Sequence, residues 1–158
     1  MRSHLLALTL LAVPTAASAV EYLTEVTSDV YPAPGMSTAQ IVDRALQCIK
    51  STSGNRAPAV EAAIDGDTVY AVVETDYRFA FAAHIVSSRL SVYARDQRFK
   101  IVHTDIDNGT VNPFTRAKMG VHTQPGGPAK GITAALAERS AAVSECIIKK
   151  PEVAGGDW

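Results

Sequence analysis

The sequence lacks several patterns, and each absence argues against a class of protein. Beyond the first 19 residues, no apolar run is long enough to cross a bilayer as a helix, so we expect no membrane span. Positive charge is not in excess, because 15 lysines and arginines stand against 16 acidic residues. Nucleic-acid-binding proteins normally carry a basic patch and a high isoelectric point. We therefore expect no nucleic acid among the partners.

Motifs for catalysis and metal binding are also missing. His84, His103 and His122 have no partner at the spacings of metal ligands, and no Gly-x-Ser-x-Gly nucleophile motif occurs. No two carboxylates stand out as an acid/base pair, and Asp65-Gly66-Asp67 lacks the rest of a calcium loop. The sequence thus indicates no catalytic residue, metal or cofactor, and favours a non-catalytic binding or interaction module. The alternative is a hydrolase-type enzyme whose residues, such as the three histidines, converge only in space.

The N-terminus has the pattern of a secretory signal peptide. An apolar run from Leu5 to Val13 precedes Ala17 and Ala19, the small residues that a signal peptidase requires. We predict that residues 1–19 are removed and that the mature protein is secreted or periplasmic. Residues 20–150 then form a single α+β domain, and residues 151–158 form a flexible tail.

The clearest structural signal lies between Arg89 and Thr104. Two runs there alternate apolar and polar side chains around Asp96-Gln97, which predicts a β-hairpin with a tight turn. The buried face then pairs Ala94 with Phe99, Val92 with Ile101 and Leu90 with His103. The solvated face takes Ser91, Tyr93, Arg95, Arg98, Lys100 and Val102.

Other segments predict further strands and two helices. Strands are expected over 21–26, over 60–64 and 69–74 around an Asp-Gly-Asp turn, and over 78–86, with Asp76 breaking the run. One helix should begin after the N-cap Ser37, with Gln40 in capping-box position, and end near Ser51. A second amphipathic helix should cover 131–149. This order predicts a two-layer α+β sandwich, an antiparallel sheet of five or six strands with both helices on one face.

Two strings of residues resemble a known family. Ser-Thr-Ala-Gln-Ile-Val-Asp-Arg-Ala at 37–45 is similar to the helical segment of DUF4468, a domain of unknown function with a TATA-binding-protein-like fold. Leu-Ser-Val-Tyr-Ala-Arg-Asp-Gln-Arg-Phe-Lys at 90–100 resembles that family's apolar strand, Lys-Asp-Gly-Arg turn and aromatic strand. Gln97 stands where glycine is usual, and Cys48 where an aromatic residue is usual. The resemblance, over about residues 24–107, implies a helix-backed curved sheet in an exported protein, and no activity.

Cys48 and Cys146 are the two cysteines of the chain. Each lies near the C-terminal end of a predicted helix, and export would place both where a disulfide persists. We therefore predict a disulfide between them. Two buried free thiols, or an intermolecular bond, are the alternatives.

Two regions are candidates for binding an unknown protein or small ligand. Tyr93, Arg95, Arg98 and Lys100 gather on the solvated face of the hairpin and would suit an acidic ligand. The alternative is a solvated strand edge whose charges discourage aggregation. The second region is the connection over 107–130, which is long for a compact domain and is either functional or mobile.

Overall fold

The β-hairpin around Asp96-Gln97 is the centre of the fold. A computed structural model describes residues 21–52 and 62–149. Strands β5 (Ala82–Arg95) and β6 (Arg98–Asp107) pair with Leu90 opposite His103, Val92 opposite Ile101 and Ala94 opposite Phe99, which confirms the predicted register. Gln97 adopts a left-handed backbone with φ 60°, a conformation that glycine takes without strain.

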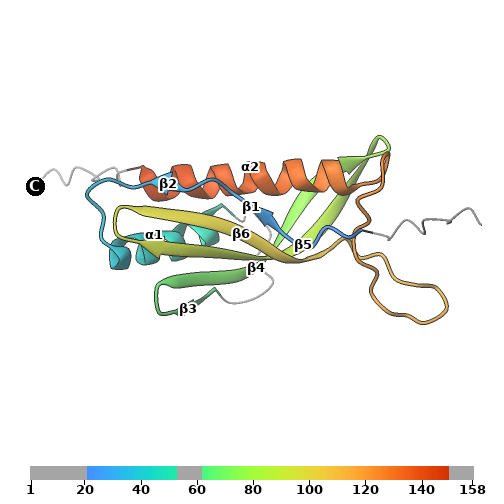
Figure 1. Cartoon of the computed structure of the whole chain (residues 1–158), viewed down its shortest axis with the longest axis horizontal. Helices are drawn as coiled ribbons and strands as arrows, with labels where there is room; N and C mark the ends of the chain where they lie inside the picture. Colours follow the sequence, from blue (N-terminus) through green and yellow to red (C-terminus); the bar gives the residue numbers. More distant parts are fainter. Residues whose placement is uncertain (1–20, 53–61, 150–158) are drawn as a thin grey trace, which may run out of the picture.

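The remaining elements complete the predicted two-layer sandwich. The sheet runs in the order β1-β6-β5-β4-β3, with β2 also paired to β6, and both helices pack on one face (Figure 1). The elements are β1 (Val26–Thr27), β2 (Tyr31–Pro32), α1 (Thr38–Ser51), β3 (Ala63–Asp65), β4 (Thr68–Phe79) and α2 (Ala129–Ile148). No helix in the described residues is both long and apolar enough to span a membrane. The predicted signal peptide, its cleavage site and the C-terminal tail lie outside the described residues.

Two long strands replace three predicted short ones. β4 continues through Asp76, which pairs with Ile85, so the predictions of a break at Asp76 and a strand over 78–86 are wrong. The chain instead turns at Ala80 and Phe81, whose φ angles are 50° and 65°. Such turns favour asparagine and glycine, and their absence here concealed the turn from sequence reasoning.

The N-terminal strand is shorter than predicted. The strand expected over 21–26 is reduced to β1 and to an isolated bridge between Tyr22 and His122. The chain then adds a second short strand, β2, whose Pro32 pairs with Arg98. Proline cannot donate a ladder hydrogen bond, and an edge position like this one is where a sheet tolerates it.

Helix α1 begins as the sequence predicts and is tied to the hairpin turn. Its N-cap Ser37 forms the full capping box with Gln40. The carboxylate of Asp96, in the turn, accepts hydrogen bonds from the Thr38 hydroxyl at 2.8 Å and the Thr38 N–H at 3.0 Å. These bonds hold the pKa of Asp96 below its usual range, and the bond from the Thr38 hydroxyl has the larger effect.

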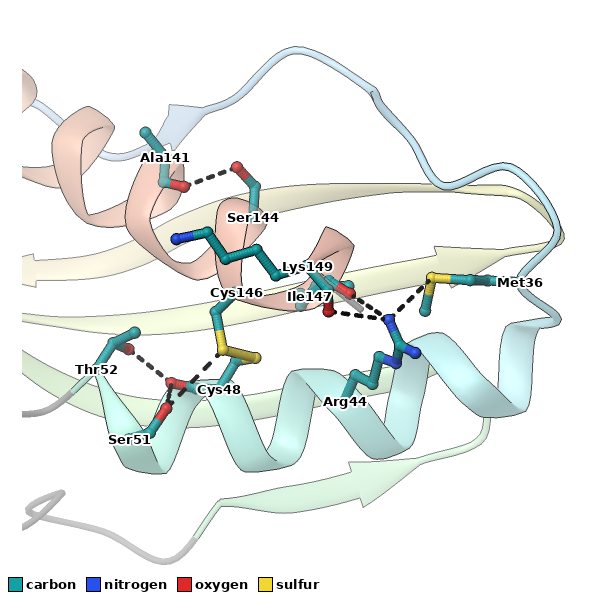
Figure 2. The surroundings of a disulfide bond; sticks show 10 residues. All are labelled: Met36, Arg44, Cys48, Ser51, Thr52, Ala141, Ser144, Cys146, Ile147 and Lys149. Carbon is teal, nitrogen blue, oxygen red and sulfur yellow. Dashed lines mark hydrogen bonds between the residues drawn. A yellow bond between two sulfur atoms is a disulfide. The ribbon is translucent and has the colours of Figure 1, made fainter. Parts of the chain in front are cut away.

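A covalent bond and an arginine join the two helices. The predicted disulfide between Cys48 and Cys146 is formed, with a Cα–Cα distance of 5.7 Å (Figure 2). Beside it, the Arg44 guanidinium on α1 donates to the carbonyls of Ile147 at 3.1 Å and Lys149 at 3.3 Å (Figure 2). These carbonyls end α2 and have no partner within the helix, so Arg44 caps α2 from its neighbour.

A polar layer divides the core into two apolar clusters. One cluster lies under α1 and includes Leu90 and Val143, and the other, at the far end of the sheet, includes Val86 and Leu136. Between them the imidazole of His103 is fully buried. Its Nδ1 lies 2.9 Å from Ser88 Oγ on β5, and its Nε2 lies 3.2 Å from Ser140 Oγ on α2. We call Ser88, His103 and Ser140 the polar layer.

The connection over 107–130 has defined local structure. Lys118 forms an ion pair at 2.6 Å with Asp107 at its base, and Val111 bridges back to Lys118. The Asn112 side-chain carbonyl accepts hydrogen bonds from the N–H groups of Phe114 and Thr115, which forms a turn at the tip. This connection leaves the sheet at the end opposite the β5–β6 turn (Figure 1).

Candidate functional site

The structure brings the four predicted ligand-binding residues together around one hollow. The side chains of these four residues point away from the helices: Tyr93, Arg95, Arg98 and Lys100. Their sequence neighbours on β5 and β6 are buried on the face that the helices cover, and adjacent residues of a strand point to opposite faces. They line a hollow of about 690 Å³ on the open sheet face beside the β5–β6 turn, a volume that suits a small organic ligand. The lining is completed by Val30, Asp67 and Thr68, together with Ala94 and Phe99.

Positive charge dominates this hollow. Arg95 and Arg98 are directly opposite each other on adjacent strands, a like-charge pairing that is unfavourable unless an anion offsets it. The ammonium of Lys100 lies 5.4 Å from the ring centroid of Tyr93, within the range of a cation–π contact. Within residues 21–52 and 62–149, none of these three cations forms an ion pair with a carboxylate. The arrangement can therefore hold an anionic group next to an aromatic face.

The centre of the open face is more covered than the sequence predicts. Ser91 and Val102, expected on the solvated face, are only 7% and 5% exposed. They face each other between the Lys100–Tyr93 contact and a second contact, in which the Arg89 guanidinium lies 4.7 Å from the Tyr70 ring centroid. The long side chains of these two contacts flank the centre of the sheet.

The three histidines lie apart. His84 stacks on Tyr77 with ring centroids 5.4 Å apart, and His122 packs on Tyr22 at 4.7 Å. His103 is enclosed in the polar layer, where its ring nitrogens contact two serine hydroxyls and the backbone of Leu136 is a further hydrogen-bonding neighbour. The structure therefore does not bring these three histidines together. In the part of the chain that the structure describes, no three His, Cys, Asp or Glu side chains gather to hold a metal ion.

Burial makes His103 a base of unusually low affinity for protons. Loss of solvation lowers the pKa of the imidazole to about 4, and the positive charge of Arg139 acts in the same direction. The polar layer therefore contains a neutral imidazole at neutral pH, with one nitrogen donating and the other accepting.

The low pKa predicts a stability that falls in acid. Between the unfolded pKa of about 6.5 and the folded value of about 4, the unfolded chain binds the extra proton, so stability rises with pH. We expect this residue to lower the free energy of unfolding by about 3 kcal/mol from pH 7 to pH 4. Denaturant unfolding at both pH values measures the change. His103→Asn should lose this pH dependence, while the exposed-site control His84→Asn should keep it; an equal slope in all three proteins would contradict the assignment.

Two solved structures share this fold. A TBP-like protein from Parabacteroides distasonis matches with a TM-score of 0.55 and 13% sequence identity, over 78% of this chain and 91% of that one. A DUF4468 family protein from Bacteroides ovatus matches with a TM-score of 0.50 and 11% identity, over 85% of this chain and 93% of that one. The fold is TBP-like. No protein-family model matches the sequence, and no curated protein does.

These two structural matches confirm the resemblance that residues 37–45 and 90–100 indicated. The matches concern the fold alone. The names of these two proteins indicate neither an activity nor a ligand. Sequence reasoning found the four side chains on the hairpin from their alternation. It missed Val30, Asp67 and Thr68, which reach the hollow from other segments and carry no local signal. It also missed Ser88 and Ser140, because a serine in a strand or helix does not reveal its buried partner.

Proposed function

We propose that this protein is an exported, non-catalytic binding module that holds an anionic ligand in the hollow beside the β5–β6 turn. The observation that carries the proposal is the direct opposition of Arg95 and Arg98 at the rim of a hollow of ligand size. Two arginines at directly paired positions suit a carboxylate, sulfate or phosphate, which can accept charge-assisted hydrogen bonds from both guanidinium groups.

The tyrosine in the hollow indicates a second feature of the ligand. Tyr93 is 41% exposed, and its ring is open to contact beside Lys100. An apolar or aromatic body attached to the anionic group could pack on that ring while the arginines hold the charge. We therefore propose an organic acid or an acidic side chain as the ligand class.

The hollow is also well anchored, as a preformed site requires. Asp96 at the turn is bonded to α1 through Thr38, and the Gln97 N–H donates to the Met36 carbonyl at 2.9 Å. The Ala94 N–H donates to the Asp67 carbonyl at 2.9 Å, which joins the opposite wall of the hollow to β5. A rigid site loses less conformational entropy when it binds.

Export is supported by the cysteines. A structural disulfide persists in oxidising compartments and is rare in the cytosol, and the Cys48–Cys146 bond is formed in this fold. Together with the apolar run and small residues at the N-terminus, this bond supports a secreted or periplasmic location.

Amide NMR titration tests the binding proposal. The mature protein is titrated separately with inorganic phosphate, benzoate and a hexaglutamate peptide. We expect at least one probe to shift the amide signals of residues 67–68 and 93–100. Arg95→Gln/Arg98→Gln should weaken that probe's binding at least tenfold, because a charge-assisted hydrogen bond contributes about 1.5–3 kcal/mol.

Arg89→Gln is the matched control for this experiment. Arg89 is also an arginine on the open face of β5, but it lies outside the hollow, against Tyr70. The proposal fails if no probe shifts these amides, or if the Arg89 variant loses as much affinity as the double variant.

A further inference from the structure

The end of the molecule opposite the ligand hollow has an exposed apolar tip at the β4–β5 turn. The side chain of Phe81 is fully exposed there, and Ile85 is 44% exposed. The three alanines around them, Ala80, Ala82 and Ala83, are exposed as well. Single exposed apolar residues are common on protein surfaces, whereas several neighbouring ones can form a patch that binds a partner or a membrane.

A second apolar tip lies in the 107–130 connection. Phe114 is 93% exposed and Val111 is 45% exposed. The turn built on Asn112 holds Phe114 at the tip, and Arg116 next to it adopts φ 58°. Phe114 is thus presented to solvent by a defined turn.

Both tips lie at the same end of the molecule's longest axis. In Figure 1 the β4–β5 turn and the 107–130 connection project at the right-hand end, while the β5–β6 turn lies at the left. The start of α2 packs closely on β4, because a Cβ added at Gly131 would lie 2.9 Å from the Arg78 carbonyl oxygen. The connection therefore returns to the sheet beside the distal end of β4.

The charges near the tips differ from those of the whole chain. Residues 77–85 and 109–119 contain Arg78, Arg116 and Lys118 and neither Asp nor Glu, although the chain has a net charge of −1. Lys118 forms its ion pair with Asp107 at the base of the connection. Arg78 and Arg116 thus provide positive charge beside two exposed phenylalanines.

We propose that this end docks on the surface of an anionic phospholipid bilayer, with Phe81 and Phe114 inserted at the level of the headgroups. Aromatic side chains favour the membrane–water interface, and basic residues are attracted to anionic lipids. Two separate convex tips suit a soft planar surface, which accepts both without a complementary groove. This docking is independent of the ligand hollow, which lies at the other end.

Vesicle sedimentation tests the proposal with the full mature protein. Probes are vesicles of equal parts phosphatidylglycerol and phosphatidylcholine, and vesicles of phosphatidylcholine alone. We expect binding to the anionic vesicles that weakens as salt is raised, and much weaker binding to the neutral ones. Phe81→Ser/Phe114→Ser should reduce binding to anionic vesicles at least tenfold. Both side chains are exposed, so the variant should unfold at the same temperature as the unchanged protein.

Ile64→Ser is the matched control, because Ile64 on β3 is an apolar residue that is 49% exposed and lies outside both tips and the ligand hollow. It should bind the vesicles as the unchanged protein does. A separate readout uses Phe81→Trp with Trp158→Phe, whose fluorescence should shift to the blue when anionic vesicles are added. Failure to sediment, or equal sedimentation of the double phenylalanine variant, would overturn the proposal. Self-association without lipid that this variant abolishes would instead assign the surface to a second copy of the chain.

Discussion

Removing the disulfide is expected to lower the free energy of unfolding by about 2–5 kcal/mol. Cys48 and Cys146 are 98 positions apart, and the entropy of an unfolded chain that is closed over so long a loop is strongly restricted. The matched change is Cys48→Ala/Cys146→Ala, which leaves no thiol and fills the buried site with a small apolar side chain. Denaturant unfolding of this variant, and of the unchanged protein with and without reductant, measures the loss.

Ser51→Ala serves as the control for the disulfide. The Ser51 hydroxyl lies 3.9 Å from the sulfur of Cys146, so this change alters the surroundings of the bond without breaking it (Figure 2). We expect an effect within about 0.5 kcal/mol. A cysteine-free variant as stable as the unchanged protein would mean that helix packing and the Arg44 cap alone hold α1 against α2.

Ile101→Ala is expected to lower the free energy of unfolding by about 2–5 kcal/mol. Ile101 is completely buried opposite Val92, beneath α1 and α2, so its truncation removes apolar contacts and leaves a cavity. Thermal and denaturant unfolding measure this loss.

Lys100→Ala is the neighbouring control, since Lys100 is exposed on the other face of β6. It loses the contact with Tyr93, which contributes about 0.5–1 kcal/mol at an exposed site. Because adjacent residues of a strand point to opposite faces, similar losses from the two variants would show that the hairpin register is wrong.

The residues that could be predicted were those with a local periodic signal. Alternation along β5 and β6 determined the pairing of Leu90 with His103, and the same alternation placed Tyr93 and Arg98 together on the open face. The capping box of α1 could be predicted equally well, because Ser37 and Gln40 form hydrogen bonds to each other's backbone within one turn. Each of these features depends on side chains that are close in the sequence.

The features that could not be predicted depend on distant contacts or break a local rule. The β4–β5 turn uses Ala80 and Phe81 at positive φ, where the sequence shows no turn residue. Asp76 is a residue that usually ends a strand, yet β4 continues through it. The hollow takes Val30 and Thr68 from other segments, and only the folded sheet places them beside the arginines. Their contribution is set by the sheet order, for which the sequence carries no local signal.

The disulfide also closes a large covalent ring in the chain. The bond between Cys48 and Cys146 closes a ring that contains strands β3 to β6 and most of α2, with the remaining described residues as arms outside it. If a protease cuts once inside this ring, for example at the exposed tip near Phe114, the two pieces stay joined through sulfur. A single cut in this connection would therefore not release half of the sheet.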